Sequence, residues 1–175
     1  MLWTILIAIV AIIAAFLIYV AMKPNAFRLE RSIVINAPAE RIFPLVDNFH
    51  NWRQWSPFEG LDPNLKRSYS GPESGVGAVY AYEGNNRAGA GRMEIRESVA
   101  GGKVLASLDF SRPFVAHNFA EFTFRPSAGS TVVNWAMYGP SPFMSKLFTT
   151  FMSLDSMIGK HFDEGLANLK RVSEG

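Results

Sequence analysis

Residues 28–43 read RLERSIVINAPAERIF, and this stretch predicts a β-strand that runs directly into a short helix. Ile33 and Ile35 fall on one side of the chain and Ser32 and Val34 on the other, which is the period of two that a half-buried strand shows. Pro38 follows, and proline is tolerated in the first turn of a helix because its missing N–H needs no partner there. Ile42 then begins an apolar stripe. The folded domain is therefore expected to open with a strand and a helix.

From residue 66 onward the apolar residues recur at every second position, which predicts strands. Glycine and asparagine clusters separate the apolar runs, as at Gly84-Asn85-Asn86 and Gly101-Gly102, and such clusters are typical of hairpin turns. We therefore expect an antiparallel sheet. Its further strands are predicted at Lys66–Ser70, Ala78–Glu83, Gly91–Ser98, Lys103–Phe110, Val115–Phe124 and Thr131–Gly139.

The last part of the chain has the period of a helix. Apolar residues recur at steps of three and four from Phe143 to Val172, so one continuous helix is expected over this range. Gly159 and Gly165 each lower its helix propensity by about 1 kcal/mol, and either admit a close neighbour or mark a bend. The order of elements predicts an α+β domain in which a curved sheet packs on this helix.

The first 22 residues hold none of the 17 basic and 15 acidic residues of the chain. As a helix, Leu2–Met22 is long enough to cross a hydrocarbon core of about 30 Å. Trp3 and Tyr19 lie where aromatic rings favour the two membrane interfaces. A cleaved signal peptide is the main alternative, but its apolar region usually spans only about 7–15 residues behind a positive charge. A buried core helix is a further alternative. We expect a retained transmembrane anchor.

The chain then divides into an anchor over 1–22, a short linker over 23–27 and a folded domain over 28–172. Three basic residues follow the apolar run before residue 32, and only the α-amino group precedes it. The positive-inside rule therefore predicts a single-pass protein with its N-terminus outside and its domain in the cytoplasm. The chain has no cysteine, which is compatible with either a reducing or an oxidising compartment.

Composition excludes several classes of function. The net charge is only +2 and no basic cluster is visible, so nucleic-acid binding is not expected. His50, His117 and His161 stand far apart without partners at ligand spacing, so no metal site is expected. The chain shows no serine elbow, no cysteine nucleophile and no phosphate-binding loop, so neither a catalytic residue nor a cofactor is predicted. Glu94 lies between arginines on one strand, which indicates a solvated charge ladder.

Five segments of the domain carry a family resemblance. They are Ile33–Phe43 (IVINAPAERIF), Trp52–Pro57 (WRQWSP), Gly75–Gly77 with Tyr80 and Tyr82, Thr131–Trp135 (TVVNW) and Phe162–Lys170 (FDEGLANLK). Together they resemble the START-like superfamily, in particular its polyketide cyclase/dehydrase-like (SRPBCC) group. The resemblance covers the whole domain and implies a helix-grip fold, in which an antiparallel sheet wraps a long C-terminal helix and encloses an apolar cavity for lipids or other hydrophobic molecules.

Strand alternation predicts which side chains face the helix and so line a cavity or fill the core. Buried Tyr and Trp side chains need partners for their polar atoms, so they are suited to orient an apolar ligand. The candidate lining residues are Tyr80, Tyr82, Met93, Phe110, Trp135 and Met137 from the sheet, with Phe151 and Leu154 from the helix. Three aromatics in an irregular stretch, Trp52, Trp55 and Phe58, form either a lid, a membrane-dipping loop or simple packing of the short helices.

The leading hypothesis is a membrane-anchored, non-enzymatic protein that binds a hydrophobic small molecule or lipid between sheet and helix. The alternative is a polyketide cyclase/dehydrase-like enzyme that uses acid–base residues in the same cavity, with Glu83 and Glu97 as weaker candidates beside the tyrosines. A protein-interaction module is the third hypothesis. Only the first two require the cavity to hold a small molecule.

Overall fold

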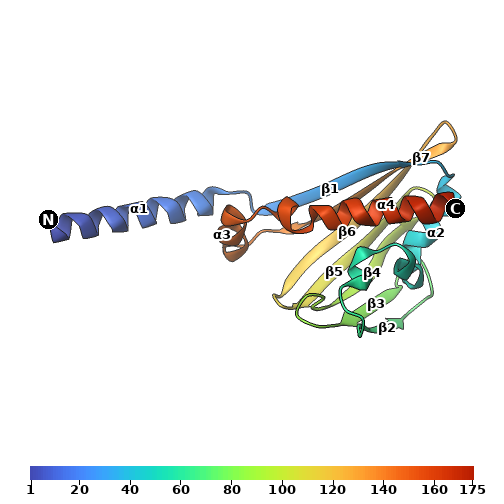
Figure 1. Cartoon of the computed structure of the whole chain (residues 1–175), viewed down its shortest axis with the longest axis horizontal. Coiled ribbons are helices and arrows are strands. Elements are labelled where there is room, and N and C mark those ends of the chain that lie inside the picture. The colour runs from blue at the N-terminus through green and yellow to red at the C-terminus, as the bar shows by residue number, and fades with distance from the viewer.

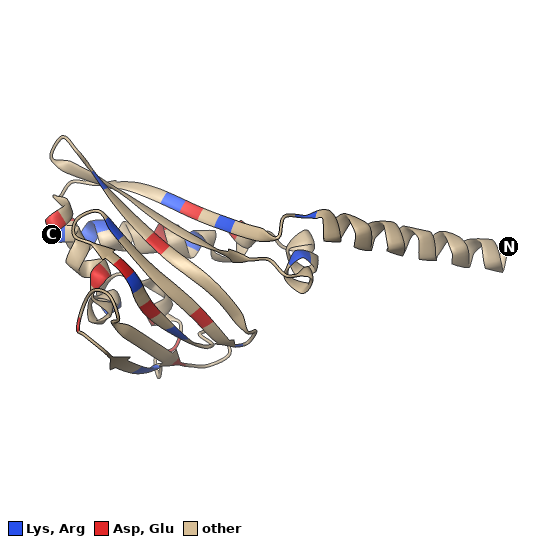
Figure 2. Cartoon of the chain, turned by 180° about the vertical axis from the view of Figure 1, so that it is seen from behind, with Lys and Arg blue, Asp and Glu red and all other residues tan.

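The computed structural model describes residues 1–175 and consists of one long helix, α1 (Leu2–Met22), projecting from an α+β domain (Figure 1). Its length and composition suit a membrane span or an N-terminal signal sequence equally well. Only 6% of its most apolar stretch is buried, which argues against the core-helix alternative. Figure 2 shows the charged residues distributed over the domain and absent from α1.

Seven strands form one antiparallel sheet in the order β1-β7-β6-β5-β4-β3-β2. All six strands predicted after residue 66 are confirmed, because each carries the period of two and ends at a glycine, asparagine or proline turn. The bounds are β1 (Ala26–Ile35), β2 (Lys66–Ser70), β3 (Val79–Glu83), β4 (Ala90–Val99), β5 (Lys103–Arg112), β6 (Ala116–Ser127) and β7 (Ser130–Pro140).

The chain crosses from β1 to β2 through three short helical segments, α2 (Ala39–Asp47), η1 (Phe49–Gln54) and η2 (Pro57–Gly60). The helix predicted after the first strand is present, but Pro38 is its extended N-cap and not part of its first turn, because α2 begins at Ala39. Pro44 lies inside α2, and the helix ends three residues later. The side chain of Asn48 accepts a hydrogen bond from the backbone of His50 and so starts η1. These segments cover the end of the sheet farthest from α1 (Figure 1).

The prediction of one continuous helix over Phe143–Val172 is wrong. The chain forms α3 (Phe143–Phe151), an extended residue at Met152, a π-helical turn η3 (Asp155–Gly159) and α4 (Lys160–Glu174). The break has a local cause at Ser153, whose hydroxyl accepts from the Ser156 backbone N–H at 3.1 Å and so begins a new helix. As a result α4 lies along the sheet, whereas α3 lies beside α1 (Figure 1).

The core lies between α4 and the face of the sheet that α4 covers, which we call the inner face. Phe162 of α4 stacks on Trp135 of β7 with ring centroids 4.1 Å apart, and Trp135 stacks in turn on Phe122 at 5.0 Å. Gly165 permits this approach, because a Cβ there would lie 2.7 Å from Cζ3 of Trp135 and 3.0 Å from Cδ of Pro57. The expectation of a close neighbour at Gly165 is therefore confirmed.

Candidate functional site

The residues predicted to line a cavity fall into three groups. Tyr80, Met93 and Trp135 are buried in the core. Tyr82, Phe110, Met137 and Leu154 are only partly buried and pack against the edge of that core. Phe151 is 74% exposed and its ring pairs with Phe16 of α1 at 5.8 Å, away from the inner face. The break at Met152 explains this placement, because it turns α3 away from the sheet.

Five partly buried residues pack against the core, and we refer to them together as the inner patch: Tyr82, Phe110, Met137, Leu154 and Ile158. Tyr82 and Phe110 both pair with Gly91 of β4, one from each side. A Cβ on Gly91 would lie 2.9 Å from the Tyr82 hydroxyl, so the absence of a side chain there makes room for the phenol. Burial raises the pKa of Tyr82 to about 12, which keeps it a neutral hydrogen-bond donor at physiological pH.

Two buried nitrogen atoms lie without a hydrogen-bond partner, Nε1 of Trp135 and Nδ1 of His161. Trp135 is 3% exposed and stands two residues before Met137 on the same face of β7. Phe58 contacts both rings, with centroids 6.3 Å from Trp135 and 5.4 Å from His161. Leaving a buried donor unpaired costs roughly 1–3 kcal/mol, so most such groups have a protein, water or ligand partner. An acceptor atom of a bound molecule is suited to pair with the indole N–H.

The aromatic stretch predicted as either lid or packing is largely core. Trp52 and Trp55 are buried, and their Nε1 atoms donate to the carbonyls of Val46 at 2.9 Å and Leu45 at 2.8 Å. Both bonds fix the indoles to α2. This placement favours packing over a lid for the two tryptophans, while Phe58 lies partly buried at the edge of the core.

A buried ionic group escaped the sequence analysis. Glu59 of η2 accepts a hydrogen bond from the Tyr80 hydroxyl and pairs with Nε of Arg67 at 2.6 Å. Burial and the bond to the Glu59 carboxylate raise the pKa of Tyr80 well above its ordinary value. The Tyr80 hydroxyl is therefore already used by the protein. Glu59 lies 8 and 21 residues from its partners, a separation at which no sequence pattern reports a contact.

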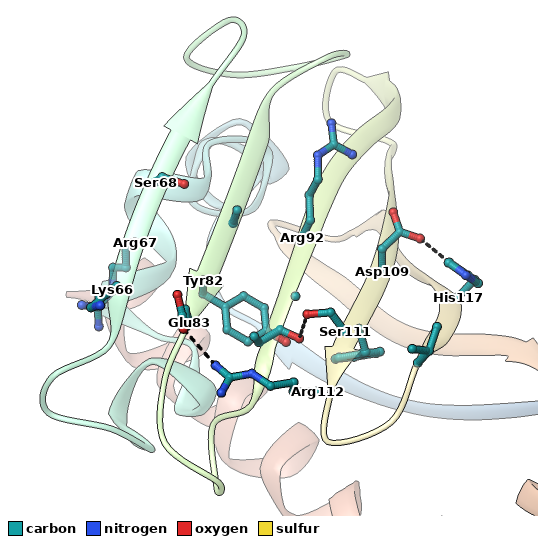
Figure 3. Close-up of a pocket in the computed structure, with 15 residues that line it drawn as sticks. Lys66, Arg67, Ser68, Tyr82, Glu83, Arg92, Asp109, Ser111, Arg112 and His117 are labelled. Atoms are coloured by element: carbon teal, nitrogen blue, oxygen red, sulfur yellow. Dashed lines mark hydrogen bonds and ion pairs between the residues drawn. The ribbon is translucent and has the colours of Figure 1, made fainter.

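A hollow of about 710 Å³ lies over β2 to β5, lined by polar side chains of the outer face together with Tyr82, Gly91 and Phe110. Figure 3 shows Arg92, Asp109 and His117 projecting on this side, with the short helices behind the sheet. Nδ1 of His117 lies 2.7 Å from Asp109, and Arg92 pairs with Glu94 at 2.6 Å. The predicted solvated charge ladder around Glu94 is confirmed, and the His117 side chain is exposed as well. Exposed ion pairs of this kind are each worth about 0–1 kcal/mol.

The third histidine, His50, stacks on Tyr69 with ring centroids 3.9 Å apart. The acids near the sheet ends are likewise engaged on the surface, Glu83 with Arg112 at 3.2 Å and Glu97 with Lys103 at 2.8 Å. No three His, Cys, Asp or Glu side chains gather closely enough to hold a metal ion. The buried side-chain nitrogens left without a partner are therefore those of Trp135 and His161, both of which lie near Phe58.

A single antiparallel sheet packed on a C-terminal helix defines the helix-grip class of fold. The same fold occurs in the Chromobacterium violaceum protein CV1439, which has 15% sequence identity and a TM-score of 0.58 over 87% of this chain and 99% of that one. A Thermobifida fusca protein matches with 18% identity and a TM-score of 0.58 over 83% and 92% of the two chains. Ara h 8.0201 matches with 11% identity and a TM-score of 0.53 over 85% and 97%.

At these identities the structures show the fold alone. A family model described as polyketide cyclase/dehydrase and lipid transport matches residues 26–174. The chain therefore belongs to the polyketide cyclase/dehydrase (SRPBCC) family, as its sequence motifs predict. A comparison with curated proteins found no match.

Proposed function

We propose that this protein is a membrane-anchored binding protein for an amphipathic small molecule or lipid, held between the sheet and α4 at the inner patch. The observation that carries the proposal is the unpartnered indole N–H of Trp135, which lies beside half-buried apolar side chains. A ligand with an apolar body and an acceptor group satisfies both features. The membership of a family that includes lipid transport supports the same reading.

The end of α1 is fastened to the domain, which supports a retained anchor over a cleaved signal. Lys146 of α3 is 5% exposed and its ammonium donates to the carbonyl of Ala21 at 3.2 Å and to Oδ1 of Asn25 at 2.6 Å. Val20 is fully buried. A cation at a helix C-terminus is favourable, and cleavage after α1 would leave this buried charge without the Ala21 carbonyl. Because β1 begins at Ala26, the linker shortens to three residues.

Native mass spectrometry of the full chain, released from mild detergent, tests the proposal. A bound lipid or other apolar molecule is expected in the wild type and should be reduced in Met137→Trp, which enlarges a side chain of the inner patch. Val34→Trp is the matched control, because Val34 is exposed on the outer face of β1. A reproducibly empty wild type, together with no thermal shift from a panel of lipids and sterols, would contradict the proposal.

The enzymatic alternative, a polyketide cyclase/dehydrase-like activity, needs a titratable group beside the bound molecule. His161 is the residue to examine, since its Nδ1 is buried, unpaired and stacked next to Phe58. Turnover of a bound polyketide or aromatic compound that is lost in His161→Gln, while binding persists, would favour the enzyme. Binding without any chemical change of the ligand would favour the carrier.

A further inference from the structure

Helix α3 carries an apolar stripe that no other part of the domain covers. Met144, Phe148 and Phe151 fall four and three residues apart, so they share one face of the helix, and they are 70%, 49% and 74% exposed. The only charged residue from 140 to 154 is Lys146, which points away from the stripe and into the contact with α1. A contiguous exposed apolar face without charge marks a surface for a membrane or a partner.

The position of α3 beside α1 sets how deep the stripe lies if α1 spans a bilayer. The ring of Phe151 pairs with that of Phe16, which stands six residues before Met22. Six residues of helix correspond to about 9 Å along the axis. The ammonium of Lys23 lies 5.6 Å above the ring of Tyr19, a pairing typical of the headgroup level. Phe151 therefore lies on the hydrocarbon side of that level.

The two threonine hydroxyls of α3 find acceptors within the helix, as an apolar environment requires. The hydroxyls of Thr149 and Thr150 donate to the carbonyls of Ser145 at 2.9 Å and Lys146 at 2.7 Å. Thr150 also accepts from the ammonium of Lys23 at 2.9 Å. Neither threonine therefore needs water to satisfy its side chain.

We propose that α3 is a second membrane contact, lying in the interface of the leaflet where α1 ends, with its apolar stripe among the lipid acyl chains. The inference rests on the anchoring proposed above. Leu154 of the inner patch follows Phe151 by three residues, so the stripe leads from the acyl chains toward the patch. A membrane lipid then has an apolar route into the domain that avoids bulk water.

Site-directed spin labelling of the full chain in nanodiscs of phosphatidylcholine and phosphatidylglycerol tests this inference. The chain has no cysteine, so single-cysteine variants need no background substitution. Labels at Met144→Cys and Phe148→Cys report on the stripe, and a label at Ile12→Cys in α1 reports on the anchor. Val99→Cys is the aqueous control, since Val99 is half-exposed at the opposite end of the sheet.

Compared with the Val99 label, both α3 labels are expected to collide more often with oxygen and less often with a water-soluble nickel chelate. The ratio of the oxygen to the nickel collision rate should be several-fold higher than at Val99. An immersed Ile12 label with aqueous α3 labels would overturn this inference and leave the anchor intact. An aqueous Ile12 label would contradict the anchor itself. Dipolar broadening between labels on two copies would assign the stripe to self-association and also overturn the inference.

Discussion

Replacing Trp135 by phenylalanine separates a ligand-binding role for its N–H from a purely structural one. In the lipid-free protein the substitution removes an unpaired buried donor, a gain of roughly 1–3 kcal/mol. The smaller ring loses packing against Phe162 and Phe122, a cost of about 1–2 kcal/mol. These effects oppose each other, so the free energy of unfolding should lie between about 1 kcal/mol below and about 2 kcal/mol above that of the wild type.

Ligand binding should respond differently. The wild type recovers the cost of its unpaired N–H when a ligand acceptor pairs with it, and Trp135→Phe has no such gain. The affinity for an acceptor-bearing ligand should therefore fall by about 1–3 kcal/mol, or about 5- to 150-fold. Chemical denaturation of delipidated protein gives the first quantity, and titration with the lipid identified by mass spectrometry gives the second.

Trp55→Phe is the matched control, because the indole N–H of Trp55 already donates to the Leu45 carbonyl at 2.8 Å. Its removal strands a buried acceptor as well as shrinking the ring, so Trp55→Phe should destabilise the lipid-free protein by clearly more than Trp135→Phe does. If both variants lose the same stability and ligand affinity is unchanged in Trp135→Phe, the N–H has a partner unrelated to the ligand and the reasoning is refuted.

Further outcomes follow from other parts of the structure. Gly165→Ala should lower the free energy of unfolding by roughly 1–3 kcal/mol in denaturant titrations, despite its better helix propensity, because the new Cβ overlaps Trp135. Burial raises the pKa of Asp47, so its charge costs stability at neutral pH; Asp47→Asn should raise Tm at pH 7, and the gain should vanish below the unfolded pKa of about 3.9. The Asn36 backbone N–H and Lys170 lower the pKa of Glu174, so Glu174→Gln should lower Tm at pH 7 and have no effect in acid. For Asp47 as for Glu174, an equal change of Tm at both pH values would contradict the pKa shift. GFP fused after Gly175 should fluoresce, and alkaline phosphatase fused at the same place should be inactive. The reverse pattern would place the domain outside the cytoplasm.

Much of the sheet was predictable because its cause is local. Period-two apolar runs interrupted by glycine clusters define hairpins without reference to the rest of the chain, and Lys66–Ser70 is predicted to the residue. The inward direction of Trp135 and Tyr82 likewise follows from alternation alone. Family motifs in the strand–helix entry at Ile33–Phe43 add the topology that local patterns lack.

The features that could not be predicted from the sequence depend on tertiary contacts between segments far apart in the chain. The apolar stripe continues from α3 through Met152 into α4, so hydrophobic period alone could not show that the α4 half packs on the sheet while the α3 half is exposed beside α1. Phe151 was assigned to the cavity for this reason. Strand alternation correctly predicts that Tyr80 faces the helix, but it does not predict that the Tyr80 hydroxyl donates to Glu59, which lies 21 residues away in the sequence.

The hydrogen bond between Lys146 and the Ala21 carbonyl at the end of α1 also constrains the order in which the chain folds during synthesis. The two partners are 125 residues apart, and β1 pairs only with β7, so neither contact exists until nearly the whole chain has been synthesised. An anchor that enters the bilayer first leaves β1 as an unpaired edge at the membrane surface during that interval. If α1 spans a bilayer as proposed, the fold is completed at the membrane surface, where Lys146 joins α3 to the end of α1. Slow or failed pairing of β1 with β7 should consequently appear as aggregation of nascent chains at the membrane.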